Sequence, residues 1–284
     1  MGRHYKIEYG MMNKIMKKKH KYLVLLMGLL IILLSSLTFC VVNSYYVISL
    51  ENGATLRVFK ASIFNKRNSV IMIIPGGGYK ILSKWNEGYY WAPFLYSLGY
   101  TVAVLEYRVP VHNYAMPMSD AFKAITAIKK MIDNDTTLGL MGFSAGGHLA
   151  STMMVLDSDS LRPDFVLLFY PVVSMKKELT HLGSRNKLLG ERPSDELECQ
   201  FSNELHISDK NPPVFIAVSK DDDLVNPQNS IVLYNAIKAK GRHASLHIYP
   251  EGGHGWGYRS PFPYRKQMIT DMVYWLDSLN KMQN

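Results

Sequence analysis

From residue 45 onward, short apolar runs alternate with stretches in which apolar residues recur at helical spacing. Six of the runs are almost entirely apolar, which is typical of strands that are covered on both faces. These six predicted strands are 70–74, 101–106, 138–141, 165–169, 214–218 and 246–249. Two earlier runs, 45–50 and 55–61, are separated by Asn52-Gly53. That dipeptide predicts an antiparallel pair joined by a tight turn.

Two stretches carry the spacing of amphipathic helices, with apolar residues recurring three or four positions apart. The first set is Met118, Ala121, Phe122, Ile125, Ile128 and Ile132, and the second is Met268, Ile269, Met272, Val273, Leu276 and Leu279. We interpret both as helices that pack on the sheet. Strands that alternate with helices predict an α/β fold with a mostly parallel central sheet flanked by helices.

Residues 172–212 interrupt this alternation. The stretch is polar and irregular, and it contains Pro193, Pro212 and Pro213. We expect a small cap-like excursion over the ends of the strands. Because connecting segments often carry the residues that select a ligand, we also expect substrate selection there.

The net charge of +9 is concentrated at the N-terminus. Residues 1–21 carry seven basic side chains against the single acid Glu8, and the rest of the chain is nearly balanced. Nucleic-acid binding would need a basic surface on the folded domain itself, so we exclude it. The 21 residues Tyr22–Val42 that follow have no charged side chain. This run is long enough to cross a bilayer.

We therefore divide the chain into a basic, hydrophobic signal or anchor segment, residues 1–44, and one folded domain, residues 45–284. Basic residues ahead of an apolar run stay in the cytoplasm, which would place the domain on the non-cytoplasmic side of the membrane, in the periplasm or cell envelope. The length of the run favours an uncleaved anchor over a cleaved signal peptide. The bulky Phe39 disfavours a lipid on Cys40, and Cys199 has no partner for a disulfide within the domain.

The sequence Gly142–Gly147 reads GFSAGG, a GxSxG motif between a predicted strand and a helical stretch. In that context the small residues permit a strained turn that presents the serine hydroxyl at the edge of the sheet. The N-terminus of the following helix also favours developing negative charge. We predict Ser144 as a nucleophile.

A serine hydroxyl needs a base to take its proton, and the base needs an acid to orient it. In this arrangement the chain order is serine, acid, histidine. The last histidine is His254, in EGGHGWG just after the predicted strand that ends at Tyr249. We predict His254 as the base. The other histidines near or after the motif fit less well as the base. We expect His148 to pack on the helix after the motif, His243 and His247 to flank or belong to a late strand, and His181 and His206 to lie in the 172–212 segment.

The acid is expected on the turn after the strand 214–218, where the sequence SKDDDLVNP offers three adjacent aspartates. Such turns commonly read DxxV, and Asp222 stands three residues before Val225. We therefore predict Asp222 as the acid, with Asp221 as the alternative.

The oxyanion of a tetrahedral intermediate needs backbone amides that no side chain obstructs. PGGGY at Pro75–Tyr79 follows a predicted strand directly, so Gly77 or Gly78, together with Ala145 after the nucleophile, are the candidate donors. The sequence has no phosphate-binding glycine motif, no HExxH and no Cys/His cluster. We expect neither a cofactor nor a metal.

Many ordered segments resemble one known family over roughly residues 50–280. They are PGGGY, EGYYWAPFLYSLGYTVAVLEYR, AMPMSDAFKAI, GFSAGGHLAS, YPVVSM, THLGSRNKLLG, FSNELHISDKNPP, DDDLVNPQNS and YPEGGHGWG. The chain is similar to α/β-hydrolases related to bacterial acetylxylan esterases and, more distantly, to hormone-sensitive-lipase-like esterases. The resemblance implies the α/β-hydrolase fold.

The same resemblance maps Ser144, Asp222 and His254 onto the family's triad, and Gly77, Gly78 and Ala145 onto its oxyanion hole. It implies a carbohydrate acetylesterase without metal or cofactor that removes acetyl groups from xylan-type sugars. The chain departs from the family pattern at Asn226, where proline usually follows the valine, and in its N-terminal apolar segment.

We therefore expect a serine carboxylic-ester hydrolase that acts on a small acyl ester or an acetylated saccharide and contacts the membrane through its N-terminal segment. The same groups would also serve a peptidase or an arylformamidase-type amide hydrolase. A third possibility is an inactive, anchored protein that binds a glycan.

Overall fold

The computed structural model describes residues 16–30, 45–50, 53–61, 66–109, 111–259 and 261–282. The chain divides into two units, Met1–Ser44 and Tyr45–Asn284, and each is described by itself.

In the first unit, residues 16–30 are helical. The predicted apolar span Tyr22–Val42 runs beyond residue 30, so its second half lies outside the described residues, as do Phe39, Cys40 and most of the basic segment. Within the part of the chain that the structure describes, no helix combines the length and the apolar character needed to cross a bilayer.

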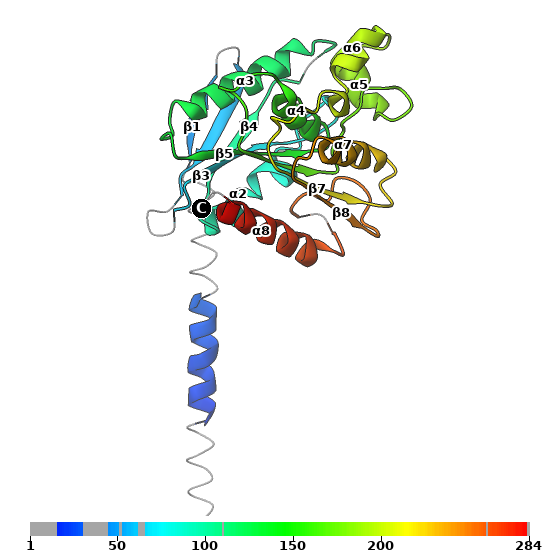
Figure 1. Ribbon diagram of the computed structural model, residues 1–284. Coiled ribbons are helices and arrows are strands. Elements are labelled where there is room, and N and C mark those ends of the chain that lie inside the picture. The colour runs from blue at the N-terminus through cyan, green and yellow to red at the C-terminus, as the bar shows by residue number, and fades with distance from the viewer. Residues whose placement is uncertain are drawn as a thin grey trace, which may run out of the picture. The chain divides into compact units, whose positions relative to one another are not determined.

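The second unit is built on an eight-stranded sheet with the strand order β1-β2-β4-β3-β5-β6-β7-β8 (Figure 1). Its strands are β1 (Tyr46–Ser49), β2 (Thr55–Phe59), β3 (Ser69–Ile74), β4 (Thr101–Glu106), β5 (Thr137–Phe143), β6 (Phe165–Phe169), β7 (Val214–Ser219) and β8 (Ala244–Tyr249). Strand β2 runs antiparallel to β1 and β4, and the strands from β4 to β8 in the sheet are parallel. All eight predicted strands are present, although Asn52 of the predicted turn lies outside the described residues.

Helices and shorter turns connect the strands. They are η2 (Trp85–Tyr89), α2 (Ala92–Ser97), α3 (Ala115–Lys129), α4 (Ser144–Val155), α5 (Leu182–Leu189), α6 (Asp195–Gln200), η3 (Asn203–Leu205), α7 (Gln228–Ala239) and α8 (Arg265–Met282). Helices α3 and α8 correspond to the two predicted amphipathic helices. Residues 172–212 differ from the irregular excursion we expected, because they hold α5, α6 and η3.

The sheet separates two hydrophobic cores. Along β3, Val70 and Met72 face the core shared with α3, α4 and α7, while Ile71 and Ile73 face the core shared with α2 and α8. This alternation explains why the strand is apolar throughout, since each face of the strand is buried. Figure 1 shows α3, α4 and α7 on one side of the sheet and α2 and α8 on the other.

Because the central strands are parallel, their carboxyl ends lie at one edge of the sheet. The loops that leave β3, β5, β7 and β8 at this edge carry the glycine run, Ser144, Asp222 and His254. Ligands of open α/β sheets bind at this edge. The topology thus brings together residues that are more than a hundred positions apart in sequence.

Candidate active site

Ser144 lies at the sharp turn between β5 and α4, where its φ is +50°. This left-handed conformation is strained for a residue with a side chain, and neighbouring glycines make the turn sterically possible. A Cβ at Gly142 would lie 2.6 Å from the Gly146 carbonyl oxygen, and a Cβ at Gly146 would lie 2.1 Å from the Ile74 carbonyl oxygen. The turn holds Ser144 at the carboxyl edge of the sheet with only 6% of its surface exposed.

Ser144, His254 and Asp222 form one hydrogen-bonded chain. The Ser144 hydroxyl lies 2.8 Å from Nε2 of His254, and Nδ1 of His254 lies 2.7 Å from Oδ2 of Asp222. The second carboxylate oxygen of Asp222 accepts from the backbone amides of Leu224 and Val225, at 3.1 and 2.9 Å. Asp222 is therefore fixed on both sides, and it orients the ring so that Nε2 faces the serine.

Asp221, the alternative acid, has a different set of partners. Its exposed carboxylate accepts from the backbone amides of Gly252 and Gly253, at 3.2 and 2.9 Å. The hydrogen bond from Gly253, with that from Gly252, lowers the pKa of Asp221. The structure thus brings Asp222 to His254, while Asp221 ties down the loop that carries this histidine.

The glycine run after β3 forms a tight turn beside Ser144. The carbonyl oxygen of Gly77 accepts from the amides of Lys80 and Ile81, at 3.0 and 3.1 Å, and the φ of Gly77 is +120°. A Cβ at Gly77 would lie 2.3 Å from the Ile81 carbonyl oxygen, so only glycine fits there. At Ala145, the first turn of α4 leaves backbone amides without partners inside the helix. Both candidate sources of oxyanion donors therefore adjoin Ser144.

A pocket of about 570 Å³ opens over these residues. Its lining includes Gly77, Gly78, Ser144 and His254, and also Glu87, His181 and Leu224. His181 caps α5 through a hydrogen bond from the Ser184 amide at 3.2 Å, so the 172–212 segment contributes to the wall as expected. Burial, followed by the charge of His254, lowers the pKa of His181.

Glu87 and His181 are among the pocket residues that sequence reasoning did not assign to the site. Glu87 is only 3% exposed, and it lies in η2 within the aromatic stretch EGYYWAPF. An isolated acidic residue in such apolar surroundings is a usable sign of a buried carboxyl group. His181 had no comparable sign, because it lies in a polar segment.

His148 is buried and hydrogen-bonded away from Ser144. The hydroxyl of Tyr79 lies 2.8 Å from Nδ1 of His148, and Nε2 lies 2.8 Å from the Phe201 carbonyl oxygen. Burial lowers the pKa of His148 to about 4. The ring therefore connects the end of the glycine run with the 172–212 segment as a neutral group.

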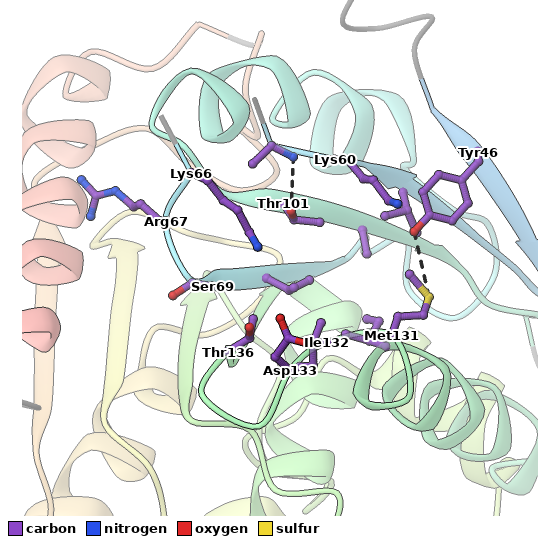
Figure 2. A pocket seen from close by; sticks show the side chains of 15 residues that line it. Tyr46, Lys60, Lys66, Arg67, Ser69, Thr101, Met131, Ile132, Asp133 and Thr136 are labelled. Carbon is purple, nitrogen blue, oxygen red and sulfur yellow. Dashed lines mark hydrogen bonds between the residues drawn. The ribbon is translucent and has the colours of Figure 1, made fainter. Parts of the chain in front are cut away.

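A second, smaller hollow of about 280 Å³ lies at the opposite edge of the sheet. Figure 2 shows Ser69 and Thr101, the first residues of β3 and β4, among its lining side chains, together with Lys60 and Asp133. None of the predicted site residues lines this hollow. The candidate active site is thus confined to the carboxyl edge.

In the described ranges, no group of His, Cys, Asp or Glu side chains is arranged to hold a metal ion. Cys199 is a free, exposed cysteine. The hydrogen-bonded chain of Ser144, His254 and Asp222 at the carboxyl edge has the arrangement used for acyl transfer.

Comparisons with known proteins place this geometry in context. The chain is 36% identical to an acetylxylan esterase from Xylanibacter ruminicola over 223 residues, which is 76% of this chain and 46% of that protein. The chain therefore spans about half the length of this curated relative.

Two solved structures superpose on most of the chain. An acetyl ester-xyloside bifunctional hydrolase from Caldicellulosiruptor lactoaceticus has a TM-score of 0.74 and 32% identity, over 81% of this chain and 90% of that one. MGS-M1, an α/β-hydrolase enzyme from a deep-sea metagenome library of the Medee basin, has a TM-score of 0.64 and 24% identity, over 83% and 97%. The expected α/β-hydrolase fold is confirmed. Since the BD-FAE family model matches residues 56–237, the chain belongs to the BD-FAE family.

Proposed function

We propose that this chain is a serine esterase that removes acetyl groups from xylan or xylan-derived sugars. The observation that carries the proposal is the hydrogen-bonded chain Ser144–His254–Asp222, of which Ser144 and His254 line the same pocket as the glycine run. The names of the acetylxylan esterase and the acetyl ester-xyloside hydrolase support acetylated xylan sugars as the substrate class.

The proposed reaction follows from the positions of these groups. His254 takes the proton of Ser144 as Oγ attacks the acetyl carbonyl carbon, and Asp222 stabilises the imidazolium that forms. Amides of the glycine run and of Ala145 donate to the oxyanion. When the C–O bond to the sugar breaks, the alkoxide leaves with the proton from His254. Water, deprotonated by His254, then attacks the acetyl-serine, so acetate departs and Ser144 regains its proton.

The test uses the full chain and a Ser144→Ala variant, with p-nitrophenyl acetate, longer acyl esters and acetylated xylan as substrates. We expect acetate release from the acetyl esters, and loss of the nucleophile should lower kcat by roughly four or more powers of ten. An intact chain that cleaves none of these esters would contradict the proposal.

The same experiment addresses the alternatives. Hydrolysis of peptide amides or of N-formyl arylamines in preference to acetyl esters would favour an amide hydrolase. If a fluorophosphonate probe failed to label Ser144 and no ester were cleaved, an inactive glycan-binding protein would be the better interpretation.

We also propose that residues 1–44 anchor the chain and place the domain on the non-cytoplasmic side of the membrane. The support is the sequence alone: seven basic side chains in residues 1–21 precede 21 uncharged residues.

A further inference from the structure

Glu87 is a buried carboxyl group beside the candidate active site that the proposed reaction does not use. It lies in the π-helical turn η2, between the glycine run and α2, and it lines the pocket that contains Ser144. Burial raises the pKa of Glu87, and hydrogen bonds and the charge of His254 oppose that shift. A carboxyl group is costly to bury, so its partners are informative.

The first partner of Glu87 belongs to the glycine run. Oε2 accepts from the backbone amide of Gly76 at 2.9 Å. A Cβ at Gly76 would lie 2.9 Å from the same carboxylate oxygen and 2.8 Å from Cβ of Ser144. The carboxylate is therefore hydrogen-bonded to the start of the glycine run, and this part of the run lies beside both Glu87 and Ser144. A shift of Glu87 would move the glycine run.

The second partner leads to the loop that carries His254. Oε1 of Glu87 accepts from the Tyr170 hydroxyl at 2.9 Å, and that hydroxyl accepts from the backbone amide of Gly257 at 2.9 Å. The Tyr170 ring packs edge-on against the His254 ring, with 4.7 Å between the centroids. Tyr170 therefore connects the Glu87 carboxylate with the loop that carries His254, by a hydrogen bond to its backbone and by ring packing against its histidine.

The neighbouring residue in η2 contacts the same loop. The Asn86 side chain donates to the Gly255 carbonyl oxygen at 3.2 Å and accepts from the Arg259 amide at 2.8 Å. The Asn86 carbonyl oxygen accepts from the Tyr258 amide at 2.9 Å. The turn η2 therefore contacts the loop after β8 directly through Asn86 and, by way of Tyr170, through Glu87, which also accepts from the glycine run.

We propose that Glu87 is a positioning residue, whose carboxylate holds the glycine run and, through Tyr170, the His254 loop in one fixed mutual geometry. This inference rests on the proposed esterase function. Oxyanion donors and a base act only when both are aligned on the same carbonyl carbon, and small displacements cost much of the rate. A carboxylate with one oxygen bonded to the glycine run and the other bonded to Tyr170, which in turn bonds the His254 loop, fixes that alignment before substrate binds.

The test compares Glu87→Gln, Tyr170→Phe and the double variant in the full chain, with p-nitrophenyl acetate as substrate. Gln keeps the size of the side chain but can accept at only one of the two positions, and Phe keeps the ring but removes the hydroxyl. We expect each single variant to lower kcat by about 10–100-fold with KM changed less than about threefold, since alignment and not binding is lost. The double variant should be about as slow as the slower single variant, because both changes break one linkage.

Tyr249→Phe is the matched control. It also removes a hydroxyl that donates to a carboxylate, Oδ2 of Asp271 at 3.0 Å, but Asp271 lies on α8 and neither of these two residues lines the pocket. We expect kcat of this variant to equal that of the unsubstituted chain. Thermal unfolding of all variants shows whether a lower kcat arises only because less of the protein is folded.

Wild-type kcat in Glu87→Gln would overturn the inference, and so would losses that multiply in the double variant or that follow a fall in Tm. If the unsubstituted chain cleaves no ester, the proposed function fails separately. The rate at which a fluorophosphonate probe labels Ser144 then provides the comparison, and equal rates in wild type and Glu87→Gln overturn the inference.

Discussion

At the scale of single residues, the two adjacent aspartates Asp221 and Asp222 have different hydrogen-bond partners. Asp222 contacts the His254 ring, whereas Asp221 contacts only the backbone of its loop. Asp222→Asn should lower kcat for p-nitrophenyl acetate by about 10⁴-fold, because the amide favours the wrong tautomer of the histidine. Asp221→Asn should lower kcat by much less, since it weakens two loop hydrogen bonds only. A reversed order of the two losses would show that Asp221 is the acid.

The sequence predicted Ser144, His254 and Asp222 as the hydrogen-bonded triad, but it left Asp221 as an alternative acid. Ser144 and His254 have local glycine patterns and a fixed chain order, which are visible in the sequence. Neighbouring aspartates on one turn point in different directions, and only the backbone geometry decides which one faces inward. Glu87 was missed because its partners Gly76 and Tyr170 are 11 and 83 residues away and no short motif connects them with it.

At the scale of elements, the close approach of α4 to β3 gives a prediction about packing. A Cβ at Gly146 would lie 2.1 Å from the Ile74 carbonyl oxygen and 2.4 Å from that of Pro75, which are rigid backbone atoms. Gly146→Ala should therefore push α4 away from the end of β3, lower the stability by about 2–3 kcal/mol and displace Ser144. Urea unfolding and kcat for p-nitrophenyl acetate measure the two effects.

Gly241→Ala provides the control for that experiment. Gly241 has a φ of +69° with nothing within 4 Å of an added Cβ, so alanine there costs only the left-handed backbone strain, about 1–2 kcal/mol. Its kcat should match that of the unsubstituted chain. If Gly146→Ala also retained full kcat, the close approach would not be needed to position the nucleophile.

The strands and the two long helices were predictable, whereas the sheet order and the short helices of 172–212 were not. Buried strands are almost entirely apolar, and α3 and α8 are long enough to show helical periodicity. Helices α5 and α6 have 8 and 6 residues, too few for a reliable apolar stripe, and α5 is capped by His181, an unusual residue for that role. The pairing of β2 with β4 depends on long-range contacts that no local pattern encodes.

At the scale of the whole molecule, burial of His148 makes stability depend on pH. The pKa of His148 falls from 6.5 to about 4 on folding, so between these values the unfolded chain binds a proton that the folded chain does not. Its contribution is fully present above pH 6.5 and is lost as the pH falls toward 4, by about 3 kcal/mol in total. Burial also lowers the pKa values of His181 and His247, which act in the same direction.

Urea unfolding of the full chain at pH 7 and pH 4.5 measures this effect, with His148→Gln as the comparison. The glutamine does not titrate, so its stability should fall less between the two pH values than that of the unsubstituted chain. An equal fall in both would assign the pH dependence to other groups.

The division into two units predicts separable roles for the N-terminal segment and the domain. Residues 45–284 expressed alone should keep the kcat and KM of the full chain for p-nitrophenyl acetate, because every residue placed at the site lies in that unit. The full chain should sediment with cell membranes, and the shortened chain should not. Equal fractions of both in the membrane pellet would contradict the proposed anchor.

The π-helical turn η2 also has a consequence for how new specificities could arise in this scaffold. If Glu87 holds the glycine run and, through Tyr170, the His254 loop in one geometry, these two loops tolerate little change. The segment 172–212 contributes wall residues but neither the nucleophile nor the base. Substitutions confined to that segment should therefore change which esters the enzyme accepts, while the turnover of p-nitrophenyl acetate stays almost unchanged.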